Sequence, residues 1–215
     1  MARQPRFRIA DIAQLITQRG NNRQDVFFSE QDYLYYLDVL NETAIKYKCQ
    51  IHAFALMSNH IYILATPTTL DGISQLMKGV GQRYVSYINK LEKRTGTLWD
   101  GRYKASLVED GHYLIACMRY IEMTPVRSKI AKTPKNYQWS SYRTNAQGKD
   151  AGVKITPHES YSALVQWSDK NDKDVQEEYK QLIREQINEE ELQKISKASD
   201  SCLVYGSKEF QQSIK

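Results

Sequence analysis

The sequence predicts an α+β fold followed by a helical C-terminal extension. Short apolar runs and stretches of helical spacing follow one another as strand, helix, strand, strand, helix, strand and helix over residues 14–123. A polar linker lies near residues 144–154, and the rest is acidic with helical spacing. With 215 residues, 41% of them hydrophobic and 26% charged, the chain has the composition of a globular protein with a sizeable core.

The first strand is expected at residues 14–18, and it ends at a turn rich in Gly and Asn. Ser29 and Asp32 form a variant of the capping box, which predicts a helix from there to about residue 47. Its expected buried stripe consists of Tyr33, Leu34, Leu37, Leu40, Ala44 and Ile45.

Two strands are expected at residues 50–57 and 60–66, with a turn at Ser58 and Asn59. Because successive strand side chains point to opposite faces, His60 and Tyr62 share one face, and Ile61, Ile63 and Ala65 share the other. This pattern can present a pair of side chains to a metal or a substrate. It is also the pattern of an ordinary half-buried strand.

A long helix is expected from about residue 71 to residue 93, with apolar residues at helical spacing from Ile73 to Leu91. Gly79 and Gly81 within it indicate a close contact. After the loop at 95–104 come a strand at 105–109 and a helix at 110–123, which Pro125 ends. This order predicts a ferredoxin-like sandwich whose 60–66 strand lies near the middle of an antiparallel sheet. The remaining helices are expected at 157–167, 172–187 and 189–198.

The charge is distributed unevenly along the chain, and its sign changes near the end of the predicted α+β segment. Residues 1–150 carry 21 Lys and Arg against 13 Asp and Glu, a net charge of +8, whereas residues 151–215 carry 9 against 12, a net charge of −3. We therefore expect a domain at 1–145 and an acidic extension at 146–215. A basic front with many aromatic residues is typical of nucleic-acid binding, although a merely solvated basic surface has the same composition.

Other function classes are disfavoured by what the sequence lacks. No apolar run approaches the ~20 residues of a membrane span, and no signal region follows the basic N-terminus, so we expect a cytoplasmic protein. Three widely separated cysteines argue against a disulfide framework and against a cysteine-based zinc site.

Four stretches share the order and spacing of a known family. They are Gln18-Arg-Gly-Asn-Asn-Arg-Gln24, Met57-Ser-Asn-His-Ile-Tyr62, Gly96-Thr-Leu-Trp-Asp-Gly-Arg-Tyr-Lys104, and Arg119-Tyr-Ile-Glu-Met-Thr-Pro-Val-Arg127 with Trp139-Ser-Ser-Tyr142 behind it. On these stretches the chain resembles the REP-associated tyrosine transposases of the HUH single-tyrosine transposase superfamily, over about residues 3–143.

The resemblance implies a nicking reaction on single-stranded DNA beside a hairpin. A tyrosine hydroxyl attacks the phosphodiester and forms a 5′-phosphotyrosine with a free 3′-OH. Family members hold Mg²⁺ or Mn²⁺ with two strand histidines and one polar side chain on the nucleophile's helix. By position, the nucleophile here is Tyr120, the first histidine is His60, and the remaining two metal positions are Tyr62 and Thr124.

Those two metal positions depart from the family pattern, because Tyr62 replaces a histidine and Thr124 replaces the usual Asn. A neutral phenol is a poor ligand for Mg²⁺, so metal binding is expected to be weakened. Three functions remain open: a working transposase with a modified site, a DNA-hairpin binder that has lost most of its catalysis, and a basic scaffold for protein partners. Tyr62 could also serve as a second reactive tyrosine.

The DNA contacts and the extension are the last predictions. The phosphate-contact candidates are Arg19, Arg23, Arg83, Arg102, Lys104 and Arg127, and the base-contact candidates are Asn22 and Trp99. For each residue, a surface salt bridge or structural packing is the alternative. The acidic extension could regulate access to the site, or pack on the basic front and mimic the charge of DNA. The expected partner is hairpin-bearing single-stranded DNA, bound by a monomer or a homodimer.

Overall fold

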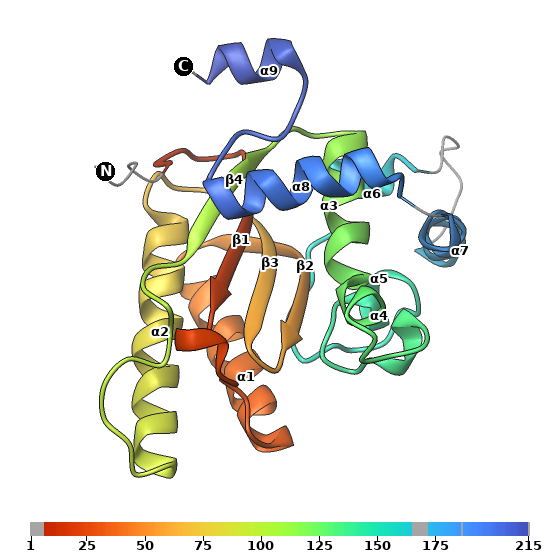
Figure 1. Cartoon of the computed structure of the whole chain (residues 1–215). Coiled ribbons are helices and arrows are strands. Elements are labelled where there is room, and N and C mark those ends of the chain that lie inside the picture. The colour runs from red at the N-terminus through yellow and green to blue at the C-terminus, as the bar shows by residue number, and fades with distance from the viewer. Residues whose placement is uncertain (1–6, 165–171, 186, 215) are drawn as a thin grey trace.

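The structure is a computed structural model that describes residues 7–164, 172–185 and 187–214. Its first half follows the predicted order of elements (Figure 1). The elements are β1 (Ala13–Arg19), α1 (Glu30–Lys46), β2 (Cys49–Met57), β3 (His60–Pro67), α2 (Gly72–Leu91), β4 (Lys104–Val108) and α3 (His112–Glu122). After α3 come α4 (Thr124–Arg127), α5 (Tyr142–Asn145), α6 (Glu159–Ser162), α7 (Asp172–Arg184), α8 (Glu189–Ser201) and α9 (Lys208–Ser213).

The four strands form one antiparallel sheet in the order β2-β3-β1-β4. This is the strand order of a ferredoxin-like sheet, and β3 lies in its interior as predicted. The register pairs Arg19 of β1 with His60 of β3, and Thr17 with Tyr62. On its other side Thr17 is paired with Lys104 of β4. Residues paired in this way point to the same face of the sheet.

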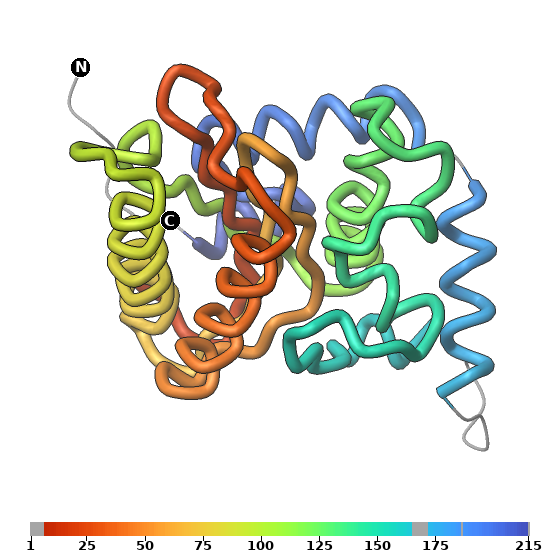
Figure 2. Tube along the Cα trace, turned by 90° about the horizontal axis from the view of Figure 1, so that it is seen from below, coloured from red at the N-terminus to blue at the C-terminus, as the bar shows by residue number. Residues whose placement is uncertain are grey.

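Helices cover both faces of this sheet, as Figure 2 shows from below. On one face α1 and α2 bury Ile16, Ile61 and Ile63 in a first core. On the other face α3 and the extension bury Leu15 and Leu64 in a second core. The alternation along β3 therefore puts Ile61, Ile63 and Ala65 under α1 and α2, and turns His60, Tyr62 and Leu64 toward α3.

The start of α1 agrees with the prediction, but its buried stripe does not. The Asp32 carboxylate accepts hydrogen bonds from the backbone N–H groups of Phe28 and Ser29, both at 2.8 Å. Leu34 and Ile45, predicted to be buried, are 47% and 63% exposed. At about 100° per residue they fall on the side of the helix opposite the face that packs on both the sheet and α2. The spacing of apolar residues in the sequence did not show which side of α1 would be buried.

The two glycines of α2 have different surroundings. A Cβ atom on Gly79 would lie 2.8 Å from Cγ2 of Thr43 on α1, so this glycine marks the predicted close contact between helices. A Cβ atom on Gly81 would meet nothing within 4 Å. The helix ends at Leu91, which is exposed rather than part of the core.

The extension packs on the second core. Tyr179 and Ile183 of α7 and Ile195 of α8 join Leu114 of α3 there. The segment predicted as a polar linker also packs, because Ala151 and Val153 are buried in the first core. The predicted helix at 157–167 is shorter, with α6 covering Glu159–Ser162, and residues 165–167 and 186 lie outside the described part. The division into two domains at residue 145 stays a prediction.

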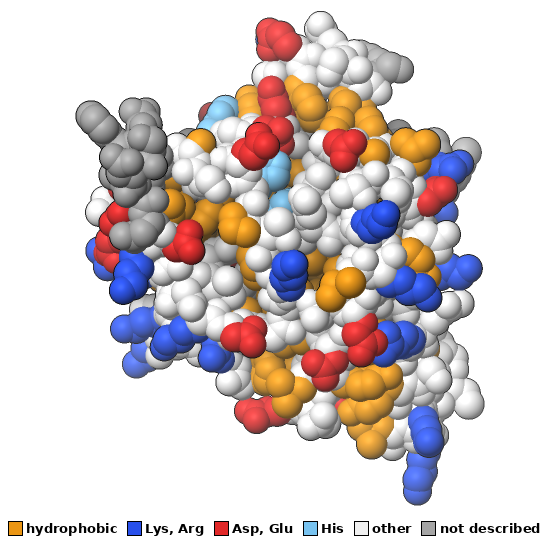
Figure 3. Space-filling model, turned by 180° about the vertical axis from the view of Figure 1, so that it is seen from behind, with side chains coloured by type: hydrophobic (Ala, Val, Ile, Leu, Met, Phe, Trp, Pro, Cys, Tyr) orange, Lys and Arg blue, Asp and Glu red, His pale blue; other side chains and the backbone are white. Residues whose placement is uncertain are grey.

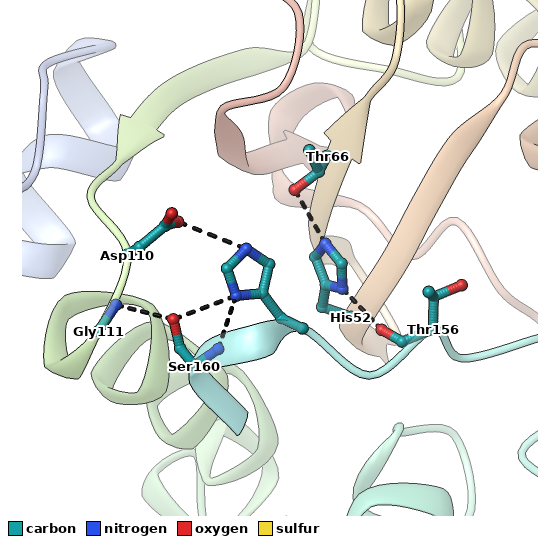
Figure 4. A network of polar contacts seen from close by, with 7 residues as sticks. His52, Thr66, Asp110, Gly111, Thr156 and Ser160 are labelled. Atoms are coloured by element: carbon teal, nitrogen blue, oxygen red, sulfur yellow. Dashed lines mark hydrogen bonds and ion pairs between the residues drawn. The ribbon is translucent and has the colours of Figure 1, made fainter. Parts of the chain in front are cut away.

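A polar network fastens the start of the extension to the sheet (Figure 4). His52 on β2 donates through Nδ1 to the Thr156 carbonyl at 2.7 Å, and its Nε2 accepts from the Thr66 hydroxyl at 2.9 Å. His158 caps α6 by accepting from the Ser160 N–H, and its Nε2 lies 3.4 Å from the Asp110 carboxylate. Each ring nitrogen of His52 thus has a partner, and burial lowers the pKa of His52 to about 4.

The surface seen from behind in Figure 3 carries acidic and basic side chains interspersed with one another. That face therefore does not concentrate charge of one sign. Among the described residues, no helix has the length and apolar character needed to cross a membrane.

Candidate active site

Three of the four motif stretches meet at one end of the sheet, where β1 and β2 end and β3 and β4 begin. The Gly20 N–H donates to the Asn59 carbonyl at 2.8 Å, and the Asn21 N–H donates to the Leu98 carbonyl at 2.9 Å. Gly20 and Trp99 form a β-bridge beside them. The fourth stretch, on α3 and α4, covers the sheet face to which His60 and Tyr62 point. The fold thus brings together segments more than 100 residues apart.

Tyr120 of α3 lies against Tyr62, which in turn contacts His60. Its ring meets that of Tyr62 edge-on with centroids 5.6 Å apart, and the Tyr62 ring meets that of His60 in the same way at 5.3 Å. The Arg127 guanidinium lies over the Tyr120 ring, 4.2 Å from its centroid. These contacts hold His60, Tyr62 and the predicted nucleophile in a row.

His60 is a neutral imidazole with one free ring nitrogen. Its Nδ1 lies 2.6 Å from Oδ1 of Asn59, so Nδ1 carries the proton and Nε2 has a lone pair. Burial lowers the pKa of His60 to about 4, and the positive charge of Arg19 adds to this effect. The imidazole is therefore neutral at pH 7 and can accept a proton or bind a cation.

Tyr62 stays a neutral phenol under ordinary conditions. Burial raises its pKa well above the usual range, and the neighbouring Tyr120 raises the pKa further. A group that resists ionisation is a weak ligand for a hard divalent cation and a weak nucleophile. Tyr62 is therefore better suited to orienting Tyr120 than to attacking a phosphate itself.

The hydroxyl of Thr124 is already used within the chain. It donates to the Tyr120 carbonyl at 2.9 Å and accepts from the Arg127 guanidinium at 2.7 Å. Arg127 also donates to the same Tyr120 carbonyl. Thr124 and Arg127 therefore fasten the turn between α3 and α4 beneath Tyr120, and the Thr124 side chain is buried.

The donor set fits a divalent cation poorly. Only the imidazole of His60 offers a good free donor atom, because Tyr62 is a neutral phenol and the Thr124 hydroxyl already has two partners. Mg²⁺ and Mn²⁺ prefer several oxygen ligands, carboxylates above all. Within the described part of the chain, no group of three His, Cys, Asp or Glu residues could hold a metal ion. The binding of Mg²⁺ or Mn²⁺ stays a prediction.

Five of the predicted DNA contacts lie near this end of the sheet. Arg19 and Lys104 are half-exposed on the face of Tyr62, and both approach Asp200 of α8. Asn22 and Arg23 lie in the short 3₁₀ turn after β1, and Arg102 lies in the loop before β4. All three are exposed. Asn22 has the left-handed φ of 52°, which Asn adopts more readily than most residues.

Two other predicted contacts have structural partners instead. Arg83 lies on α2, in the helix layer on the opposite face of the sheet, and pairs with Glu42 of α1 at 2.7 Å. Trp99 is 4% exposed and packs in the first core near Tyr36 and Tyr84. Its packing matches the alternative of a Trp beneath the loop, and this conformation leaves little ring surface on which a base could stack.

Two residues that matter here carried no clear sequence signal. Asp200 is one acidic residue among many in the extension, and only the fold places it beside Arg19 and Lys104. Glu122 is fully buried two residues after Tyr120. It accepts hydrogen bonds from Ser141, Asn145 and Tyr179 at 2.5 to 3.0 Å. A glutamate within an apolar helix pattern was the only hint of this cluster.

Comparison with known proteins agrees with this geometry. The family model of the IS200-like transposases matches residues 12–124, which is more than half of the chain. A solved REP-associated tyrosine transposase bound to a REP hairpin is similar in fold, with a TM-score of 0.58 and 15% identity over 74% of this chain and 96% of that one. A transposase candidate from Deinococcus radiodurans R1 aligns with a TM-score of only 0.38 and 19% identity, over 63% of this chain and 97% of that one. No curated protein matches the sequence.

The matched segment runs from the strand before the Gly-Asn turn to Thr124. It contains β1, the His60 strand, β4 and the helix of Tyr120. The chain therefore belongs to the family of IS200-like transposases.

Proposed function

We propose that this protein binds single-stranded DNA beside a hairpin at the face formed by His60, Tyr62 and Tyr120, and that its strand-cleavage step is weak. The observation that carries the proposal is that three distant motif stretches meet at one end of the sheet, while the fourth, with Tyr120, covers the face to which His60 and Tyr62 point. The likeness to a transposase solved with a REP hairpin supports the choice of DNA partner. The basic residues 1–150, with a net charge of +8, suit a polyanion.

Cleavage would proceed through Tyr120. Attack of its oxygen on a backbone phosphorus forms a phosphotyrosine bond and breaks the bond to the 3′ oxygen, which leaves as a 3′-OH after taking up a proton. The proton that the tyrosine loses passes to solvent, because His60 lies beyond the Tyr62 ring and burial lowers its pKa to about 4. The edge-on contact with the Tyr62 ring and the Arg127 guanidinium orient the nucleophile.

Weak cleavage follows from the donor set. Phosphoryl transfer needs positive charge at the transferring phosphate, which metal ions often supply. Here the residues at two of the three metal positions, Tyr62 and Thr124, fit a cation poorly. DNA binding depends on other residues, so a protein of this design binds better than it cuts.

The test is a nicking assay on end-labelled single-stranded DNA that carries a hairpin, with and without Mn²⁺. We expect the wild type to bind this DNA and to cleave it slowly. The double variant Tyr62→His with Thr124→Asn is expected to cleave roughly tenfold faster or more in Mn²⁺, because it restores two ligands. Tyr120→Phe is the control that removes the nucleophile.

Three results would contradict the proposed function. Fast wild-type cleavage that needs no divalent cation would show that the weak donor set does not limit the reaction. Cleavage that survives Tyr120→Phe would show that another residue, with Tyr62 the first to examine, is the nucleophile. Failure to bind any structured single-stranded DNA would instead favour a scaffold with protein partners.

A further inference from the structure

The C-terminal end of α8 crosses β4 and β1 (Figure 1), on the face of the sheet to which Tyr62 points. The Ser106 hydroxyl of β4 donates to the Ala198 carbonyl at 2.7 Å and fixes the last turn of the helix. Two residues further on, Asp200 places its carboxylate 3.7 Å from Arg19 and 3.6 Å from Lys104. A residue of the extension thus bridges two strands of the catalytic sheet.

The register places this ion-pair cluster next to the site. Arg19 is paired with His60, and Thr17 lies between Tyr62 on one side and Lys104 on the other. All of these side chains point to the same face as Tyr62. The Asp200 carboxylate is close enough to Tyr62 to contribute to the rise of its pKa. Arg19 and Lys104 therefore border the phosphate-transfer site directly.

The position of Asp200 in its own helix is unfavourable. It lies in the last turn of α8, where the helix dipole disfavours negative charge, and that turn contains no basic residue. All three side chains are about half exposed, and exposed pairs at these distances contribute little to stability. These contacts are therefore easily exchanged for contacts with another anion.

We propose that Arg19 and Lys104 form a subsite for one backbone phosphate of bound DNA, and that Asp200 occupies this subsite while DNA is absent. A carboxylate and a phosphate present similar oxygen acceptors to Arg and Lys. DNA must then displace Asp200 from both cations, so the extension lowers the affinity of the site for DNA. This inference rests on the proposed function, because it assigns one phosphate contact within the same surface.

The test compares two substitutions in α8 that remove the same charge. Asp200→Asn frees Arg19 and Lys104. Glu190→Gln removes a carboxylate at the other end of α8, where its partner is Lys194. Binding is measured by fluorescence anisotropy with a pool of hairpin-bearing single-stranded oligonucleotides at low and moderate salt. Asp200→Asn is expected to bind about three- to tenfold tighter than the wild type, and Glu190→Gln within about twofold of it.

A second set of variants tests whether the gain in DNA affinity depends on Arg19 and Lys104. In an Arg19→Gln, Lys104→Gln protein, adding Asp200→Asn should leave the affinity unchanged, because no subsite remains to be freed. Asp200→Glu keeps the charge and should bind like the wild type, and Asp200→Ser should match Asp200→Asn. This second pair decides the matter if Asp200→Asn does not fold.

The outcomes separate this inference from the proposed function. Equal binding by Asp200→Asn and Glu190→Gln overturns the inference and leaves the proposed function standing. Weaker binding by a folded Asp200→Asn also overturns it, because Asp200 would then support the site instead of competing with DNA. Absence of DNA binding by every variant overturns both.

Discussion

Glu122 gives the sharpest stability prediction because it is a fully buried carboxyl group with three identified donors. Ser141 and Asn145 donate to one oxygen at 2.5 and 2.8 Å, and Tyr179 of α7 donates to the other at 3.0 Å. Burial raises the pKa of Glu122 from 4.5 to about 7, against the opposing effect of the three hydrogen bonds. The group therefore joins the helix of Tyr120 to α5 and α7 and should also make folding depend on pH.

The sign follows from the direction of the shift. Between pH 4.5 and 7 the folded protein keeps the Glu122 proton, whereas the unfolded chain releases it. The contribution to stability is thus fully present below pH 4.5 and is lost as the pH rises through 7. The two pKa values differ by enough to make this loss about 3 kcal/mol.

The perturbation is Glu122→Gln, which keeps the shape and removes the titration. We expect the free energy of unfolding of the variant, minus that of the wild type, to rise by about 3 kcal/mol from pH 4.5 to pH 8. Urea unfolding followed by circular dichroism at several pH values measures it. The difference between variant and wild type is used because both proteins contain His52 and His60. The lowered pKa values of these two histidines make stability fall as the pH drops from 6.5 toward 4, equally in both proteins.

The matched control is Glu190→Gln on the exposed face of α8. Lys194 lowers the pKa of Glu190, so its small effect should have the opposite sign. A Glu122→Gln difference that stays flat with pH would refute the reasoning, because Glu122 would then ionise alike in both states. A difference that falls with pH would show that the hydrogen bonds outweigh burial.

Three further predictions concern helix packing, a buried hydrogen bond and salt. Gly81→Ala should stabilise the protein by up to about 1 kcal/mol through helix propensity, whereas Gly79→Ala should destabilise it by about 1–3 kcal/mol, because its Cβ would lie 2.8 Å from Thr43. Thermal unfolding of the two variants compares them, and equal effects would contradict the close contact between α1 and α2. Tyr179→Phe should cost about 1–3 kcal/mol in urea unfolding at pH 8 by leaving a Glu122 oxygen without its donor, and a loss below about 0.5 kcal/mol would remove Tyr179 from the cluster. The logarithm of the DNA affinity should fall linearly with the logarithm of the salt concentration, and the slope should be smaller by about 1 in the Arg19→Gln, Lys104→Gln variant, because the two residues hold one phosphate; an unchanged slope would mean that these residues contact no phosphate.

The fold was predictable wherever local chemistry and periodicity agree. The turn at Ser58 and Asn59, the alternation from His60 to Ala65 and the cap at Asp32 each predicted an element within about two residues. Leu34 and Ile45 were placed wrongly because the buried face of α1 depends on where the sheet and α2 press against it. Periodicity gives the spacing of a stripe, but the tertiary contacts choose between neighbouring apolar residues.

The site was predictable as a set of positions but not as a set of bonds. Family motifs predicted Tyr120, His60 and Thr124 as site residues, and the fold places them near one another. That the Thr124 hydroxyl donates to Tyr120 and accepts from Arg127 is a matter of side-chain geometry, which no spacing encodes. Asp200 was beyond prediction for a similar reason, since its partners lie on strands about 100 and 180 residues earlier in the chain.

The proposed binding of hairpin-bearing single-stranded DNA is tested most directly by comparing the wild type with a variant altered on the sheet face that carries Arg19 and Lys104. A randomised pool of single-stranded oligonucleotides with a hairpin is titrated in fluorescence anisotropy, beside unstructured single strands and plain duplexes of equal length. The account predicts that the hairpin pool binds tightest, and that Arg19→Gln with Lys104→Gln weakens this binding while Arg83→Gln, on the opposite face, leaves it unchanged. Equal affinity for all three DNA forms, or a loss caused by Arg83→Gln and not by the other pair, would contradict it.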